Sequence, residues 1–223
     1  MREAYHAELG AISDGLVEMA NLVGSAIGLA TTALLDADLQ LAESVISADQ
    51  RVDDLQRDLE NRAIAVLARQ QPVATDLRIV VTSLRMSADL ERSGDLAQHV
   101  AKLARMRYPE RAVPRDLRRT ILEMGQLAQR LMAQAADVIL TQDVKVALRL
   151  EQDDDRMDEL HRTTFQHLMD ERWHHGVETA VDVALVGRYY ERFADHAVSV
   201  AQRVVYLVTG EHADQLPTDR PLA

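Results

Sequence analysis

The chain has 223 residues, of which 47% are hydrophobic and 4% aromatic, and its formal net charge is −11. It contains no cysteine, which excludes disulfides, thiolate metal sites and cysteine nucleophiles. The negative charge argues against nonspecific binding to nucleic acid or to anionic lipid. The N-terminus lacks the apolar segment of a secretion signal, and no run of about 18 apolar residues predicts a membrane span.

An apolar stripe runs through residues 5–35. Its members recur mostly at alternating steps of four and three residues, which is the spacing of one helix face. A helix of this length is typical of a bundle. Gly24 and Gly28 lie inside it, where they either weaken the helix or allow close contact with another one. The stripe consists of Tyr5, Leu9, Ile12, Leu16, Met19, Val23, Ala26, Ala30 and Leu34.

Two further helices are predicted in the first half of the chain. The segment Asp36–Asp38 offers an N-cap for the second helix. This helix ends before Pro72, because the residue that precedes a proline avoids helical geometry. A third helix is predicted at residues 74–108. Pro109 and Pro114 then mark the clearest break in the chain.

The second half repeats this plan. Helices are predicted at residues 115–140, 144–172 and 177–209. The segment Thr141–Asp143 is predicted to form a turn with a cap for the fifth helix, and Gly210 follows the sixth as a C′ stop. We therefore expect an all-α protein built as two tandem three-helix bundles, with six long antiparallel helices and an internal repeat. The expected units are residues 1–108, residues 109–210 and a loose polar tail at residues 211–223.

Acidic residues spaced four apart occur at corresponding places in both halves. On a helix this spacing puts both carboxylates on one face. We expect the chain to turn near Gln71 and near His175. With a helical rise of about 1.5 Å per residue, the four acids of each half then lie at similar heights on two antiparallel helices. The first set is Asp49, Asp53, Glu91 and Asp95, and the second is Asp154, Asp158, Glu191 and Asp195.

Four clustered carboxylates repel one another, so they need arginines, raised pKa values or a cation nearby. Oxygen ligands suit Mg²⁺, Mn²⁺, Ca²⁺ or iron better than soft metals, and bridging carboxylates could hold more than one ion. Two other interpretations remain open. About six acidic pairs at this spacing are expected by chance, and most mark a solvated face. Arg92 and Arg192 could also neutralise the acids as a salt-bridge lattice.

Three segments, Asp76–Arg78, Leu90–Asp95 and Tyr190–Ala197, resemble motifs of the PhoU family of phosphate-transport regulators. The resemblance covers nearly the whole chain. It implies two three-helix bundles that bind metal ions at all eight acids. The implied cofactors are multinuclear sites of iron, manganese, zinc or magnesium. The segment Ser93-Gly94 departs from the family pattern, in which a larger apolar residue is commoner at the first of these positions, and its glycine is expected to loosen the third helix locally.

The resemblance also implies partners and a location. It points to a non-enzymatic accessory of the phosphate ABC transporter. It further implies negative regulation of phosphate-starvation signalling through the membrane sensor histidine kinase of the phosphate two-component system. The expected location is the cytoplasm, including the inner face of the membrane. A homodimer is compatible with the long amphipathic faces, and no nucleic-acid partner is expected.

Two alternative functions do not depend on the acidic pairs. The motifs Glu3-x-x-His6 and Glu171-x-x-His174 have the spacing of di-iron carboxylate oxidoreductases, but they lie in different halves. A purely structural bundle without metal needs no motif at all. No glycine-rich phosphate loop occurs, so nucleotide or tight phosphate binding has no support in the sequence.

The histidines and the arginine-rich segment allow further predictions. We expect His196 to pack rather than bind metal, and His174 and His175 to form a turn. His161 shares the face of Asp158 and is the better candidate ligand, although a surface histidine is the simpler reading. The basic patch at residues 105–119 could bind an acidic partner or lipid headgroups, or it could be a solvated linker. Its arginines are Arg105, Arg107, Arg111, Arg115, Arg118 and Arg119.

Overall fold

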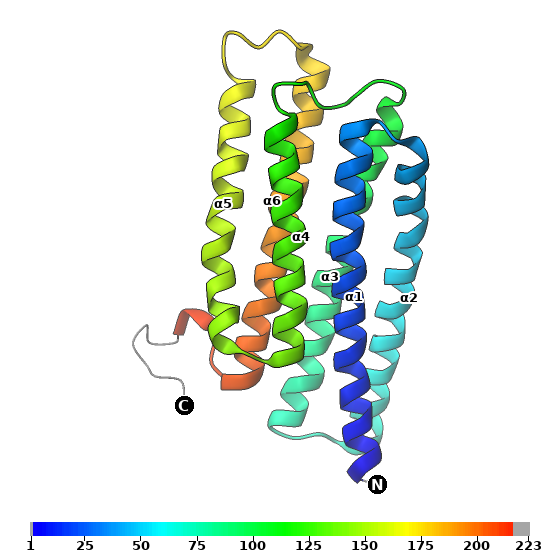
Figure 1. Cartoon of the computed structure of the whole chain (residues 1–223). Helices are drawn as coiled ribbons and strands as arrows, with labels where there is room; N and C mark the ends of the chain where they lie inside the picture. Colours follow the sequence, from blue (N-terminus) through cyan, green and yellow to red (C-terminus); the bar gives the residue numbers. More distant parts are fainter. Residues whose placement is uncertain (1, 216–223) are drawn as a thin grey trace.

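Six long helices account for most of the chain (Figure 1). The structure, a computed structural model, describes the backbone of residues 2–215 and the side chains of residues 7–213 and 215. The predicted all-α fold is confirmed. The helices are α1 (Arg2–Asp36), α2 (Leu39–Gln70), α3 (Thr75–Arg107), α4 (Arg118–Thr141), α5 (Val144–Leu168) and α6 (Gly176–Thr209), followed by the short 3-10 helix η1 (Ala213–Gln215).

Local side chains explain where several helices begin and end. Asp38 caps α2 by accepting a hydrogen bond from the backbone N–H of Leu41 at 2.9 Å. Asp143 caps α5 in the same way. Gly210 ends α6 with φ +79°, a left-handed conformation that glycine adopts without strain. The predicted caps and the predicted stop are therefore present.

The structure differs from the predictions at the end of the fifth helix and in the tail. We expected the fifth helix to reach residue 172, but α5 ends at Leu168. The backbone N–H and the guanidinium of Arg172 both donate to the Asp170 carboxylate, which folds this segment into a turn. Of the expected loose tail, residues 213–215 form η1, and residues 216–223 lie outside the described part of the chain.

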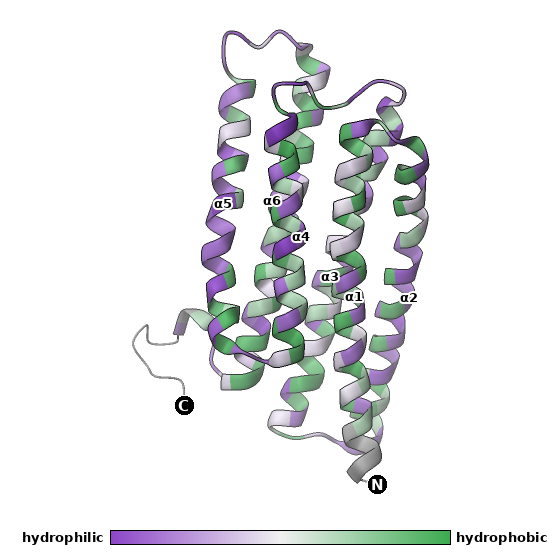
Figure 2. Cartoon of the chain, in the orientation of Figure 1, coloured by the Kyte–Doolittle hydropathy of each residue, from purple (hydrophilic) through white to green (hydrophobic). Residues whose placement is uncertain are grey.

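The two repeats pack side by side and share one core. The inner helices α1, α3, α4 and α6 contact one another across the repeat boundary, as α1 against α4 and α3 against α6. The α2–α3 connection lies at the end of the molecule where the chain begins, and the α5–α6 connection lies at the opposite end (Figure 1). The outer helices α2 and α5 show mostly hydrophilic outward surfaces (Figure 2).

Helix α1 is the most apolar helix of the chain. We predicted no membrane span, yet residues Ala7–Asp36 are long and apolar enough to cross a membrane by length and composition alone. The helix packs against α2, α3 and α4, and its stripe from Leu9 to Leu34 is largely buried. The interior of this protein therefore accounts for the apolar character of α1.

Small residues let the inner helices approach closely. A Cβ atom at Gly125 of α4 would lie only 2.3 Å from Thr31 Oγ1 of α1. Thr31 also forms a buried hydrogen bond of 2.8 Å with the hydroxyl of Tyr190 on α6. Gly24 and Gly28 face Met132 and Gln129 of α4, so these glycines allow helix contact rather than weaken α1.

The connection between the repeats is partly packed and partly solvated. Ala112, Val113 and Leu117 are buried, whereas Arg111, Arg115 and Arg119 are exposed. Three of the six arginines predicted to form a basic patch instead bind carboxylates of this chain. The pairs are Arg105 with Glu43, Arg107 with Asp182 and Glu178, and Arg118 with Asp36.

Candidate functional site

The four acids of the first repeat come together on the α2–α3 hairpin, as the counting of residues predicts. Burial, together with the charges of Asp95 and Asp53, raises the pKa of Asp49 to about 6. The pKa of Glu91 is also raised, first by burial and then by Asp95, Asp53 and Asp49. Asp53 and Asp95 thus lie close enough to Asp49 and Glu91 for their charges to raise the pKa values of both.

The second repeat gathers its acids in the same way on the α5–α6 hairpin. Burial, together with the charges of Asp195, Asp158 and Glu191, raises the pKa of Asp154 to about 7. Burial and Asp195 also raise the pKa of Glu191. The mutual repulsion makes both hairpins places where a proton or a cation is favoured.

The first cluster also explains the unusual Ser93-Gly94 segment. Helix α3 is continuous through it, so the expected local loosening is not seen. A Cβ atom at Gly94 would lie 3.0 Å from Asp49 Oδ1. Glycine here lets α3 approach the Asp49 carboxylate, and the buried hydroxyl of Ser93 donates to the backbone carbonyl of Asp89 at 2.9 Å.

The two clusters differ in their neutral and positive neighbours. The Gln98 side-chain amide donates to Asp49 Oδ2 at 2.8 Å, and Lys102 attracts the same carboxylate. In the second repeat Val198 stands at the place that corresponds to Gln98. Among the described residues, the buried Oδ1 of Asp154 has no hydrogen-bond partner. The second cluster is therefore the less compensated of the two.

His161 lies beside this second cluster. Its ring packs edge-to-face against Phe165 with a centroid distance of 5.0 Å, and its Cδ2 lies close to Gly187. The buried Nε2 of His161 has no hydrogen-bond partner among the described residues, and its positive form would attract Glu191. His161 is therefore half-buried beside the acids, and the simpler reading of a surface histidine is wrong.

The chemistry of both clusters fits a hard or borderline cation. Carboxylate oxygens come from two facing helices, and in the second cluster one buried oxygen lacks a donor. As the side chains stand, no three acids or histidines in the described part of the chain form a metal-binding group. Binding would thus require the carboxylates to close around the ion.

The salt-bridge lattice is not formed by the arginines that we expected. Arg92 and Arg192 are exposed, and neither forms an ion pair within the described residues. Instead, Arg57 lies 3.7 Å from Asp53, and Arg188 pairs with Glu191 three residues later. Each cluster thus receives one partly exposed guanidinium for four carboxylates, which leaves most of the negative charge uncompensated.

The remaining histidine predictions have mixed outcomes. His196 lies 3.4 Å from Asp89, so the prediction of a packing role is confirmed. His174 and His175 belong to the α5–α6 turn, as predicted, and His175 Nε2 lies 3.3 Å from an Asp116 oxygen. Glu171 precedes this turn outside any helix. The side chains of Glu3 and His6 lie outside the described ones.

The sequence analysis missed two buried ion pairs between α3 and α6. Asp89 of α3 is only 6% exposed, and it accepts a hydrogen bond of 2.5 Å from the Nε of Arg203 on α6. At the other end of the same helix pair, Asp182 accepts a hydrogen bond of 2.6 Å from Arg107 Nε. Asp89 stands next to the apolar Leu90 in a buried stretch, and that pattern could have signalled a paired acid.

Comparisons with known proteins agree with this geometry. The PhoU domain model matches residues 16–104 and 121–204, which correspond to the two repeats. A phosphate-specific transport system accessory protein, PhoU homolog 2 of Mycobacterium tuberculosis, is 49% identical over 210 residues, covering 94% of this chain and 99% of the relative. PhoU homolog 1 of Mycobacterium leprae is 46% identical and covers 99% of this chain and 100% of its own length.

Solved structures show the same architecture. The crystal structure of PhoU from Pseudomonas aeruginosa superposes with a TM-score of 0.85 at 30% identity, covering 93% of this chain and 100% of that one. The phosphate transport system regulatory protein PhoU from Streptococcus pneumoniae gives 0.84 at 25% identity, with coverage of 94% and 99%. The whole chain, both repeats and the helix packing therefore match one family, and this protein belongs to the PhoU family of phosphate-transport accessory proteins.

Proposed function

We propose that this protein turns down phosphate-starvation signalling and phosphate uptake when phosphate is plentiful. It would do so by contacts with the phosphate ABC transporter and with the membrane sensor histidine kinase of the phosphate two-component system. The observation that carries the proposal is the 49% identity, over nearly the full length, to a phosphate-specific transport system accessory protein. As a family member it is an accessory or regulatory protein and not an enzyme, so the oxidoreductase alternative is wrong.

This proposal places the protein in the cytoplasm and, when bound to its partners, at the inner face of the membrane. Self-association as a homodimer belongs to the same proposal. Sedimentation equilibrium of the purified chain gives the subunit number directly. A single species at the mass of one 24.9 kDa chain over a wide concentration range would exclude the homodimer.

Deletion of the gene tests the regulatory role. Phosphate-uptake genes should be expressed in rich phosphate when the protein is absent and repressed again when it is restored. Mycobacterium tuberculosis has both a homolog 1 and a homolog 2 of PhoU, so any second family member must be deleted as well. Unchanged expression in a strain that lacks every family member would overturn the proposal.

We further propose that the two acidic clusters bind metal ions. Asp49, Asp53, Glu91 and Asp95 would hold one site, and the corresponding acids of α5 and α6 would hold the other. The raised pKa values and the unpartnered Asp154 oxygen support this proposal, because each marks negative charge that lacks a counterion. A bound cation would neutralise the carboxylates and hold each hairpin closed.

Elemental analysis of the purified protein, exchanged into buffer without chelator, tests the metal proposal. We expect near-stoichiometric iron, manganese, zinc or magnesium, and loss of the second site in a variant with Asp154, Asp158 and Asp195 changed to Asn and Glu191 to Gln. The matched control neutralises four exposed acids elsewhere: Asp14, Glu60, Asp137 and Glu171.

The comparison of these two variants decides between specific sites and a merely acidic surface. The control removes the same total charge, so it should retain the metal. Equal metal contents in the wild-type protein, the cluster variant and the control would contradict the metal proposal. The regulatory proposal would survive that result, because docking on protein partners does not require a bound ion.

A further inference from the structure

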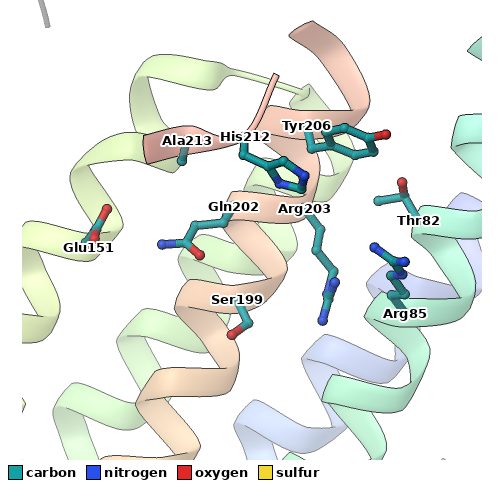
Figure 3. A pocket seen from close by; sticks show the side chains of 9 residues that line it. All are labelled: Thr82, Arg85, Glu151, Ser199, Gln202, Arg203, Tyr206, His212 and Ala213. Carbon is teal, nitrogen blue, oxygen red and sulfur yellow. The ribbon is translucent and has the colours of Figure 1, made fainter. Parts of the chain in front are cut away.

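A polar cavity of about 270 Å³ lies between α3, α5 and α6 near the C-terminal end of α6. Residues of α6 form much of its wall, and the start of η1 covers it (Figure 3). Its lining residues include none of the eight acids of the motifs, although Glu151 and Ser199 lie about one helical turn from Asp154 and Asp195, and neither the sequence motifs nor the proposed function uses the cavity. Its volume lies below the range typical of drug-sized ligands, about 300–1,000 Å³, so it suits a small ligand.

Two guanidinium groups face the space between α3 and α6. They belong to Arg85 of α3 and Arg203 of α6, which line the cavity (Figure 3). Arg203 donates to Asp89 through its Nε, and among the described residues its two Nη groups have no hydrogen-bond partner. Arg85 is exposed and forms no ion pair in the described part of the chain. The cavity thus contains several charged donors that are free to bind a ligand.

Two further side chains contact residues in this region. Arg78 lies over the ring of Tyr206 at 5.9 Å, and its buried Nε has no partner among the described residues. His196 Nδ1 lies 3.4 Å from Asp89 Oδ1, so His196 shares this carboxylate with Arg203. The carboxylate of Asp89 is thus already paired and does not reach Arg85.

At the opposite end of the same helix pair the guanidinium is fully paired. There Arg107 pairs with both Asp182 and Glu178. Free guanidinium N–H groups are thus a feature of the cavity end, where Arg85 and Arg203 lie, and not of the whole α3–α6 seam. The acid that lines the cavity, Glu151 of α5, lies on the opposite side from Arg85 (Figure 3).

Neutral donors complete the lining. Ser199 and Gln202 of α6 present a hydroxyl and an amide to the cavity (Figure 3). The ring of His212 stacks on Tyr206 with centroids 4.7 Å apart and an interplanar angle of 12°. The Thr209 hydroxyl accepts a hydrogen bond of 3.1 Å from the backbone N–H of Glu211, which helps to hold the covering segment in place.

We propose that this cavity binds a small, multiply charged oxyanion of the phosphate or sulfate class. Guanidinium groups form paired, charge-assisted hydrogen bonds to such anions. Arg85 and the free Nη groups of Arg203 would bind its oxygens, and Ser199 and Gln202 would donate to the remaining ones. The proposal is independent of the regulatory function and of the metal sites, because it uses none of their residues.

Isothermal titration calorimetry with inorganic phosphate, sulfate and chloride at constant ionic strength tests the cavity. The protein should bind phosphate or sulfate and not chloride. Arg85→Gln should weaken binding about tenfold or more, since a hydrogen bond to a charged group contributes about 1.5–3 kcal/mol. Ser199→Ala should weaken it by a smaller factor. Arg119→Gln removes the same charge from an exposed position outside the cavity and should leave the affinity unchanged.

Three outcomes would overturn the proposal. The first is no binding of either oxyanion, and the second is equal affinity in the Arg85→Gln and Arg119→Gln variants. The third is Arg85-dependent binding to vesicles that contain phosphatidic acid without binding of inorganic phosphate, which would assign the cavity to a lipid headgroup. Arg203→Gln is not used, because it leaves the buried Asp89 without its closest partner. Circular dichroism confirms that the Arg85 and Ser199 variants are folded.

Discussion

At the scale of single residues, Asp154 shows what the clustering of carboxylates costs. Burial and four neighbouring acids raise its pKa from 3.8 to about 7, and its buried Oδ1 lacks a partner among the described residues. The folded protein therefore binds a proton at this residue more tightly than the unfolded chain does. The stability gained from that proton is fully present below about pH 4, and it is lost as the pH rises through about 7.

Replacement of Asp154 by Asn should remove this pH dependence. In the presence of chelator, the variant should be more stable than the wild-type protein at pH 8 by about 1–2 kcal/mol, a value reduced for solvent screening of a partly exposed group. The difference should shrink toward pH 5. Urea unfolding at both pH values measures it, with the exposed Asp137→Asn as the control. Parallel stability profiles for the wild-type protein and Asp154→Asn would contradict the assignment.

At the scale of helices, the α3–α6 pair depends on charges buried between the repeats. Burial alone would raise the pKa of Asp89, but hydrogen bonds from His196 and Arg203 outweigh it and lower the pKa below its usual value. The contribution of Asp89 to stability is thus present above about pH 4 and is lost as the pH falls further. The pH dependence of stability expected from Asp89 is thus opposite to that expected from Asp154, because the Asp89 carboxylate has a positively charged partner.

Removal of this buried carboxylate should be costly. Asp89→Asn should destabilise the protein by about 3 kcal/mol, because it leaves the guanidinium of Arg203 without its charged partner in a buried seam, next to His196. Glu43→Gln breaks the exposed pair with Arg105 and should cost less than about 1 kcal/mol. Urea unfolding at pH 7 gives both values. Equal effects of the two substitutions would show that the Asp89 contacts add nothing beyond those of a surface pair.

At the scale of the whole molecule, the repeats share a core and should unfold together. The single tryptophan, Trp173, lies in the connection between α5 and α6 and reports on the second repeat. Leu59 is buried in α2 of the first repeat, against Gly15 of α1. Packing between α1 and α4 and between α3 and α6 links these two places.

Leu59→Ala should therefore shift the unfolding transition seen by Trp173 fluorescence. The expected loss is about 2–5 kcal/mol, as for other large-to-small substitutions in cores, and far-UV circular dichroism should report the same midpoint. The exposed Leu140→Ala, in the second repeat, is the control and should have little effect. If Trp173 unfolds at an unchanged urea concentration while circular dichroism loses an earlier phase, the repeats are independent domains.

Periodicity and spacing sufficed to predict much of this protein. The stripe of α1, the caps at Asp38 and Asp143 and the repeat of three helices follow from local preferences that each segment carries alone. The height of each acid along its helix could be predicted by counting residues from the turn, because an α-helix has a fixed rise per residue. Family resemblance, rather than periodicity, supplied the pathway and the partners.

Tertiary structure decided the features that depend on residues far apart in the chain. The pairing of Asp89 with Arg203, the burial of Val113 in the connection and the cavity beside Arg85 all require α3 and α6, or the two repeats, to pack in one particular way. The difference between the two acidic clusters also appears only there, since it rests on which neighbours reach Asp49 and Asp154. Sequence alone determined the helices and the acidic pattern through short-range geometry, while charge compensation depended on contacts between helices.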